Sequence, residues 1–187
     1  MRTFIAIRMA ATPGIREALR DLASMQSALR LVLEEQLHVT VKFLGETNEA
    51  QVPDLLNTME QVAQQLAGMQ LVPNVVFKGL GAFPSIDKPN VVWIGFSDSG
   101  PLRQLANELS EACRTLGFEP EQRPYQPHLT LARVKSEPPE RLANYLRSNL
   151  QTEYGSSPVR DMELFQSELR PNGPVYTAIG SVPLTLG

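Results

Sequence analysis

The chain contains only two histidines, and both begin the same short pattern: His38-Val39-Thr40-Val41 and His128-Leu129-Thr130-Leu131. In an extended strand alternate side chains share a face, so each histidine projects to the same side as the threonine two positions later. A fold that brings two such strands together gathers two imidazoles, which can give and take protons, and two hydroxyls, which can donate hydrogen bonds. The duplication therefore predicts two strands that meet at one site, with groups suited to phosphoryl chemistry without a metal.

One His-x-Thr pattern by itself is weak evidence. A lone histidine is usually a structural residue, and threonine is common in strands. Here, however, threonine follows both histidines at the same spacing. We therefore interpret His38 and His128 as a catalytic pair, and Thr40 and Thr130 as donors to the nonbridging oxygens of a phosphate.

The size and charge of the chain restrict its organisation and partners. It has 187 residues, of which 42% are hydrophobic, and its formal net charge is −3. This length predicts one domain over residues 1–187, made of two pseudo-symmetric lobes. The acidic balance argues against the broad basic surface of proteins that bind long duplexes, so a nucleic-acid substrate is expected to be held locally.

The compartment is inferred from cysteine use and hydropathy. A single cysteine, Cys113, cannot form an internal disulfide and is expected in the core of a protein from a reducing compartment. Arg8 interrupts the apolar run at the N-terminus, and no stretch approaches the roughly twenty apolar residues of a membrane span. We expect a cytoplasmic protein that needs neither a membrane nor an obligate protein partner.

Hydrophobic periodicity and turn residues predict the order of the elements. Expected strands cover Thr3–Arg8, His38–Gly45, Leu71–Leu80, Asn90–Phe96, the second histidine motif, Val159–Arg170 and Val175–Ile179. Expected helices run from a Thr12 cap to about Arg30, and over Asn48–Gly68, Pro101–Leu116 and Pro139–Leu150. The turn-rich stretch 81–89 is expected to be a loop at a mobile rim. This order predicts an α+β fold, bilobal and duplicated, in which two mainly antiparallel sheets flank a central cleft and helices cover the outer faces.

Three further residues are candidates for substrate binding. Arg133 is a candidate phosphate clamp, but simple alternation places it opposite His128, so a contact requires a bulge or a strand end. Lys42 lies on the His38 face by parity, either contributing positive potential or lying at the edge of the cleft. Tyr125, in the loop before His128, is the favoured candidate for stacking on a terminal base, whereas Phe43 is expected in the core.

A hydrolase that uses a bound metal is an alternative explanation for two histidines. The two motifs contain no carboxylates at ligand spacing, so further oxygen ligands would have to come from elsewhere in the chain. We therefore expect no metal and no other cofactor.

Two longer segments resemble a known family. They are similar to the two signature motifs of the 2H phosphoesterase superfamily, and their sequences are His38-Val-Thr-Val-Lys-Phe-Leu-Gly-Glu46 and Pro127-His-Leu-Thr-Leu-Ala-Arg133. Within this superfamily, they most resemble the motifs of the bacterial and archaeal RNA 2′,3′-cyclic phosphodiesterases, also called 2′-5′ RNA ligases. Supporting similarities are found at Phe4–Ile7, Val92–Gly95, Leu164–Ser167 and Gly173–Tyr176. Family members often carry an aromatic residue in the segment that corresponds to 30–37, and this chain has none there.

The resemblance implies hydrolysis of an RNA-terminal 2′,3′-cyclic phosphate to a 2′-phosphate, with His38 as proton donor and His128 as proton acceptor. The sequence alone leaves that polarity open, because free imidazoles share a pKa near 6.5. Other functions also stay open: a noncatalytic module that binds RNA ends, a phosphodiesterase for another small cyclic phosphate or a 2′-5′ linkage, and the reverse reaction, which joins RNA ends by a 2′-5′ linkage.

Overall fold

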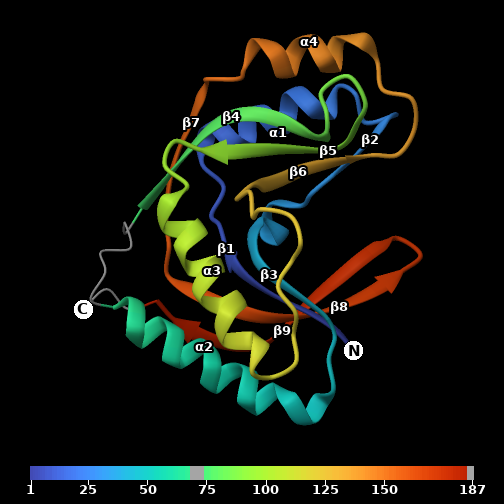
Figure 1. The fold of residues 1–187 in the computed structure, drawn as a ribbon. Helices are drawn as coiled ribbons and strands as arrows, with labels where there is room; N and C mark the ends of the chain where they lie inside the picture. Colours follow the sequence, from blue (N-terminus) through green and yellow to red (C-terminus); the bar gives the residue numbers. More distant parts are fainter. Residues whose placement is uncertain (68–73, 185–187) are drawn as a thin grey trace.

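The computed structural model describes residues 1–67 and 74–184, which form two antiparallel sheets with four helices around them (Figure 1). The smaller sheet has four strands in the order β3-β1-β8-β9. Its strands are β1 (Arg2–Arg8), β3 (His38–Glu46), β8 (Asp161–Arg170) and β9 (Gly173–Pro183). This sheet contains the first histidine motif.

The larger sheet has five strands in the order β2-β6-β5-β4-β7. Its strands are β2 (Leu29–Leu31), β4 (Asn74–Pro84), β5 (Pro89–Phe96), β6 (Leu129–Val134) and β7 (Glu153–Pro158). It contains the second motif, because His128 immediately precedes β6. Every strand pairing in both sheets is antiparallel, which confirms the predicted α+β class.

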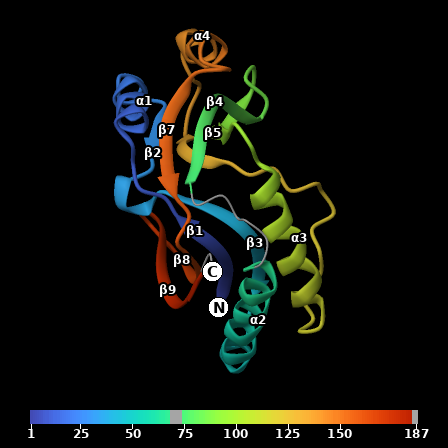
Figure 2. The same cartoon turned by 90° about the vertical axis from the view of Figure 1, so that its left-hand side faces the viewer.

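Two helices pack against each sheet (Figures 1 and 2). The helices α1 (Pro13–Ala23) and α4 (Glu140–Ser148) contact the five-stranded sheet, whereas α2 (Val52–Leu66) and α3 (Gly100–Arg114) contact the four-stranded sheet. Short 3-10 turns cover Glu34–Gln36 and Glu49–Gln51. The prediction that helices cover the outer faces, leaving the motif strands between the sheets, is therefore confirmed.

Local sequence explains where the first helices begin. The Thr12 side chain accepts a hydrogen bond from the amide of Ile15, and Pro13 takes the first helical position of α1, where its missing N–H costs nothing. Asn48 and Gln51 form a capping box ahead of α2. Each helix then buries one stripe of apolar residues against its sheet, as in α2, where Leu55, Met59, Val62 and Leu66 are all buried.

The sheets are not built from successive halves of the chain. The strand β1 and the pair β8 and β9 belong to the four-stranded sheet, whereas most of the middle of the chain forms the five-stranded sheet. One cluster of buried residues extends through both lobes, whereas the division into one domain of two pseudo-symmetric lobes stays a prediction. Cys113 is completely buried in it, as expected.

Three elements differ from the sequence-based expectations. The first helix ends at Ala23 and not near Arg30, because Leu29–Leu31 forms the edge strand β2 against β6. The strand β7 has no counterpart among the expected strands, since Glu-Tyr-Gly-Ser-Ser-Pro lacks apolar alternation. The expected mobile loop 81–89 is wrong, because β4 continues to Pro84 and β5 starts at Pro89, leaving only a tight turn between them.

The expected end of the second helix at Gly68 and the start of a strand at Leu71 lie outside the described residues. Within the described part of the chain, the helices are all too short or too polar to cross a bilayer.

Candidate active site

The two histidine motifs lie next to each other, on neighbouring strands of different sheets. The strands β3 and β6 are in contact, and the Tyr125 hydroxyl donates a hydrogen bond of 2.8 Å to the backbone carbonyl of Thr40. The charge of His128 also acts on His38. The structure therefore brings together His38, Thr40, His128 and Thr130, as the duplicated pattern predicts.

Both imidazole rings are held in the same way. The Nδ1 atom of His38 lies 2.7 Å from the carbonyl oxygen of Gln36, and Nδ1 of His128 lies 2.8 Å from that of Gln126. A carbonyl oxygen can only accept a hydrogen bond, so each Nδ1 must carry the proton. In the neutral ring this leaves Nε2 with a free lone pair, and in the charged ring Nε2 becomes a donor. The Nε2 atoms are therefore the groups available for proton transfer.

The surroundings favour the neutral form of both rings. Burial lowers the pKa of His38, the bond to Gln36 partly offsets this, and the cations Arg8, His128 and Arg133 lower it further. Burial also lowers the pKa of His128, with an opposing effect of Gln126 and a further lowering by Arg133. A negatively charged phosphate bound between the rings acts in the opposite direction and favours their protonation. Binding of an anion between the rings would therefore be coupled to protonation of an imidazole.

The threonines lie on the same face as the histidines. Thr40 pairs with Ala6 of β1, and Thr130 pairs with Trp93 of β5. Both threonines are half-buried, and neither hydroxyl has a hydrogen-bond partner among the residues that the structure describes. Each hydroxyl is therefore free to donate to a ligand.

A β-bulge follows the threonine in both motifs, and it reverses the alternation. Along β3, Thr40 pairs with Ala6 and Lys42 pairs with the preceding residue, Ile5, so that Val41 is the extra residue. The prediction that Lys42 shares the His38 face is therefore wrong: its side chain is only 2% exposed and points to the other side. The residue that returns to the His38 face is Phe43, which is 60% exposed and so does not belong to the core, contrary to expectation.

The bulge in β6 has the opposite consequence for Arg133. Thr130 pairs with Trp93 and Ala132 pairs with the preceding residue, Val92, so Leu131 is the extra residue. Leu131 and Ala132 are both buried, and Arg133 turns to the face of Thr130. The bulge that a contact from Arg133 requires is thus present, and the charge of Arg133 acts on both histidines.

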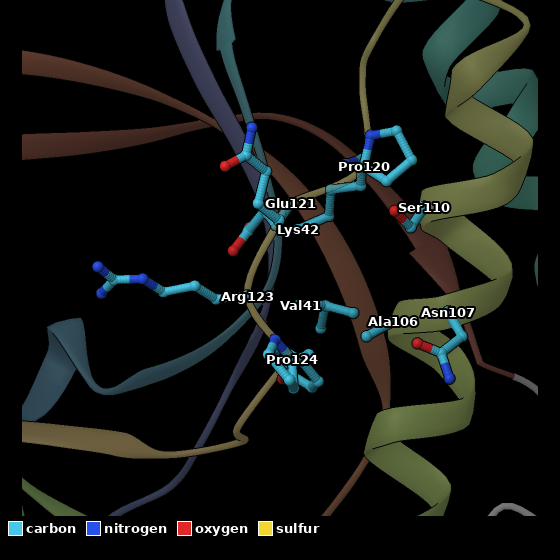
Figure 3. Close-up of a pocket in the computed structure, with 11 residues that line it drawn as sticks. Val41, Lys42, Ala106, Asn107, Ser110, Pro120, Glu121, Arg123 and Pro124 are labelled. Atoms are coloured by element: carbon cyan, nitrogen blue, oxygen red, sulfur yellow. The ribbon is translucent and has the colours of Figure 1, made fainter.

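Lys42 lies in a pocket behind the site (Figure 3). The pocket has a volume of about 360 Å³ and is lined by β3, by Ala106, Asn107 and Ser110 of α3, and by the segment 120–125. The Lys42 ammonium donates a hydrogen bond of 3.1 Å to the carbonyl oxygen of Glu119. Neither histidine lines this pocket. In this position Lys42 attaches β3 to the segment that leads into the second motif.

Tyr125 makes a second attachment between the same segments. Its hydroxyl is bonded to Thr40, and burial raises the pKa of that hydroxyl, which keeps it protonated as a donor. The guanidinium of Arg103 in turn donates to the Tyr125 carbonyl at 2.6 Å. The predicted stacking of Tyr125 on a base stays a prediction, whereas its visible contacts hold the two motifs in register.

Aromatic side chains surround both histidines, and the sequence indicated only some of them. On one side the ring of His38 lies 5.4 Å from Phe4 and 5.3 Å from Tyr176 between centroids, with Phe165 at 6.2 Å. On the other, His128 meets the edge of Phe83 at 4.9 Å and lies 6.3 Å from Trp93. Phe83 and Trp93 escape sequence reasoning because their residues predict a loop and a buried strand.

Trp93 depends on a glycine in the neighbouring strand. A Cβ atom at Gly81 would lie 2.3 Å from the indole ring, so only glycine lets Trp93 lie flat across β4. The pairing of Gly81 with Trp93 in adjacent strands carries this signal, but it becomes readable only once the register is known.

Arg8 is a further charged residue beside His38, which the sequence pattern alone does not indicate. It pairs with His38 across β1 and β3, its guanidinium lies 4.9 Å from the Phe165 ring centroid, and it bonds Glu163 at 2.7 Å.

No three His, Cys, Asp or Glu side chains are grouped as potential metal ligands in the described ranges 1–67 and 74–184.

Two strands from separate sheets, each with an anchored histidine, a free threonine hydroxyl and a bulge, define a two-histidine site of the phosphoesterase type. Comparison with known proteins agrees with this geometry. The family model of the 2'-5' RNA ligase superfamily matches residues 11–169. The chain therefore belongs to this superfamily of 2H phosphoesterases.

Individual relatives match over nearly the whole chain. An RNA 2',3'-cyclic phosphodiesterase of Archaeoglobus fulgidus is 35% identical, covering 94% of this chain and 96% of the relative. One from Methanocaldococcus jannaschii is 32% identical, covering 96% and 98%. Among solved structures, a protein of Thermus thermophilus is similar with a TM-score of 0.73 and 29% identity, covering 98% of each chain. Escherichia coli LigT complexed with 3'-AMP has a TM-score of 0.63 and 27% identity, again with 98% of each chain covered.

Proposed function

We propose that this protein hydrolyses RNA-terminal 2′,3′-cyclic phosphates to 2′-phosphates by acid/base catalysis between His38 and His128, without a metal. The observation that carries the proposal is the matched pair of imidazoles, each with Nδ1 bonded to a backbone carbonyl and Nε2 available. The names of the relatives support the same activity, and the bound 3'-AMP of the LigT structure supports a nucleotide ligand.

Hydrolysis of a cyclic phosphate needs one proton acceptor and one proton donor on opposite sides of phosphorus. In the proposed reaction, the neutral Nε2 of His128 takes a proton from water as the water oxygen bonds to phosphorus. The bond from phosphorus to the 3′ oxygen breaks, and this oxygen takes the proton from Nε2 of His38. The products are a 2′-phosphate and a free 3′ hydroxyl, with His128 left protonated and His38 left neutral, so proton exchange with solvent restores the starting state.

The assignment of donor and acceptor rests on the family resemblance. In the free protein His38 is influenced by more cations than His128, which works against its protonation. The role of His38 as donor therefore requires the anionic substrate, whose negative charge favours the protonated ring. The proposal thus couples substrate binding to activation of the acid.

The threonines and Arg133 are proposed to bind the phosphate. The hydroxyls of Thr40 and Thr130 would donate to the nonbridging oxygens, where negative charge is held through the transition state. Arg133 adds a guanidinium that can bind two oxygens at once. The same arrangement, with the 5′ hydroxyl of a second RNA in place of the attacking water, would form a 2′-5′ linkage as the bond from phosphorus to the 3′ oxygen breaks.

The test is an assay of a short RNA with a 2′,3′-cyclic end, in the presence of EDTA, with the product identified by phosphorus NMR. The wild type should form the 2′-phosphate, and His38→Ala and His128→Ala should not. Loss of wild-type activity with EDTA, restored by added metal, would disprove metal independence. An intact cyclic end in every condition would disprove the activity and favour a binding module or another cyclic phosphate.

A further inference from the structure

Arg30 is an exposed guanidinium on the face of the five-stranded sheet that carries the catalytic motif. It lies in the edge strand β2, and its partner across the β2–β6 ladder is Arg133. Directly paired residues of an antiparallel ladder project to the same face. The exposure pattern agrees, because Arg30 and Arg133 are exposed whereas Leu29 and Ala132 are buried. Arg133 of β6 and Arg30 of β2 therefore form a positive row across two strands, on the sheet face to which Thr130 also belongs.

Two like charges opposite each other on a sheet destabilise the fold unless something compensates them. Five arginines elsewhere in the chain are compensated in this way, because each forms an ion pair with a carboxylate: Arg8, Arg16, Arg114, Arg147 and Arg170. Arg30 and Arg133 have no such partner within the ranges 1–67 and 74–184. An acidic chain of net charge −3 thus keeps two opposed, uncompensated guanidiniums beside its catalytic motif.

The position of Arg30 shows in which direction the positive charge extends from Arg133. Its guanidinium lies beside the turn between β8 and β9, since a Cβ atom at Gly173 would be only 3.2 Å from Arg30 Nη1. That turn belongs to the four-stranded sheet, so Arg30 lies where the two lobes approach each other at the edge strand. Arg133 is close enough to both histidines to influence them, and Arg30 is one strand farther out. The positive row therefore leads from the reacting phosphate toward the edge of the sheet.

We propose that Arg30 binds the phosphodiester on the 5′ side of the terminal nucleotide, so that Arg133 and Arg30 hold two successive phosphates of an RNA strand. This inference rests on the proposed function and adds a substrate preference to it: the site should prefer an RNA end of two or more nucleotides to a cyclic mononucleotide. A single bound phosphate explains Arg133 but leaves Arg30 without a ligand. A second phosphate along the strand compensates both charges.

The experiment compares adenosine 2′,3′-cyclic phosphate, which lacks a 5′ phosphodiester, with the dinucleotide that carries the same cyclic end. The variants are Arg30→Ala and Arg30→Gln, with Arg30→Lys as the conservative change. Arg114→Ala is the matched control, because Arg114 is an exposed arginine on α3 with its own partner Glu111. Thermal unfolding shows which variants are folded, and Arg30→Gln retains most of the side chain if the alanine variant is not.

Arg30→Ala and Arg30→Gln should raise KM for the dinucleotide roughly tenfold or more, the usual effect of losing a hydrogen bond to a charged group. The kcat for the dinucleotide and both constants for the mononucleotide should stay within about twofold. Arg30→Lys should recover part of the loss. In the alanine variant, the slope of log KM against log salt concentration should decrease by the amount that corresponds to about one phosphate contact.

Equal losses on both substrates would overturn the proposal, because Arg30 would then act on the reacting phosphate or on the fold. So would unchanged KM for the dinucleotide. The failure of the proposed function itself is distinguishable, since the wild type would then turn over neither substrate. In that case the dissociation constants of the two 2′-phosphate products, compared between wild type and Arg30→Gln, still decide whether Arg30 binds the second phosphate.

Discussion

The two motif strands share their first half, which holds the histidine and the threonine, and differ in a residue that follows it. In β3 and β6 alike, a histidine is anchored through Nδ1 to the carbonyl two residues earlier, a threonine shares its face, and a bulge comes next. The fifth residue after the histidine then returns to the site face. In β3 this residue is Phe43, and in β6 it is Arg133.

The difference between Phe43 and Arg133 separates residues for proton transfer, which are alike in both strands, from residues for substrate binding, which are not. Proton transfer needs two similar imidazoles, whereas binding a nucleotide needs one surface for a base and one for a phosphate. Phe43 belongs to the aromatic group around His38, with its ring centroid 6.2 Å from that of Phe4. Arg133 belongs to the positive row on the five-stranded sheet. In the proposed reaction, the two motif strands therefore supply equivalent groups for proton transfer and different groups for binding.

The largest expected effect comes from the shared half. His38→Ala and His128→Ala should each reduce kcat roughly 10²- to 10⁴-fold, and the double variant should be little worse than either one because the residues act as a unit. A substrate with sulfur in place of the 3′ oxygen separates their roles, since a thiolate leaves without an acid. This substrate should restore activity to His38→Ala alone. Rescue of His128→Ala would reverse the assignment of donor and acceptor.

Which parts of this arrangement could be read from the sequence depends on the range of the signals. The histidine pair, the threonines, the order of the helices and the α+β class follow from periodicity and a repeated local pattern, and the structure has them in the expected order, although the first helix ends earlier, at Ala23. The bulges at Val41 and Leu131 leave no local signature, because a bulge depends on the register with the neighbouring strand. Strict alternation therefore placed Lys42 and Phe43 on the wrong faces.

Short or polar strands were the other source of error. The strand β2 has three residues and falls within a helical pattern, although its pairing with β6 is what exposes Arg30. Gly81 and Pro84, which usually indicate turns, make the sequence-based prediction end the first strand of the β4–β5 hairpin at Leu80, although β4 continues to Pro84. In both cases tertiary pairing outweighs local preference, so the local sequence does not place Phe83 and Trp93 next to His128.

The next effect separates the two divergent residues. Arg133→Ala should lower kcat/KM roughly 10²-fold, because a guanidinium that contacts the reacting phosphate stabilises charge in the transition state. The loss should appear with a cyclic mononucleotide as well as with RNA, and Arg133→Lys should recover part of it. A change confined to KM would show that Arg133 contributes only to binding.

Phe43→Ala should have a smaller effect of a different kind. Loss of a stacking surface for a base should raise KM about tenfold, in the range of roughly 1–3 kcal/mol per stacked base, and leave kcat unchanged. Phe43→Tyr or Phe43→Trp should retain wild-type KM. Because the ring is exposed, the free energy of unfolding should change little. A marked loss of stability without a change in KM would instead assign Phe43 to packing of the four-stranded sheet.

The pH dependence tests whether the shared half titrates as one unit. The proposed reaction needs one neutral and one protonated imidazole, and burial and neighbouring cations lower the pKa of both in the free protein. The profile of kcat/KM, which reports the free protein, should therefore be bell-shaped with its maximum below about pH 6.5. The maximum of kcat should lie at higher pH, because the bound anionic phosphate raises the pKa of both rings. A kcat/KM maximum above about pH 7 would contradict the lowered pKa values.

The smallest expected effect concerns the contact that holds the two motifs together. Tyr125→Phe removes only the hydroxyl that donates to the Thr40 carbonyl, and should cost about 1 kcal/mol of unfolding free energy, the typical net value of one hydrogen bond. Since the bond fixes β3 relative to the approach to His128, kcat should fall a few fold while KM for a cyclic mononucleotide stays the same. Chemical denaturation and steady-state kinetics measure the two effects. An increase in KM with unchanged kcat would show that Tyr125 contacts the substrate, as its sequence position suggested, and would move the aromatic binding surface from the His38 side to the His128 side.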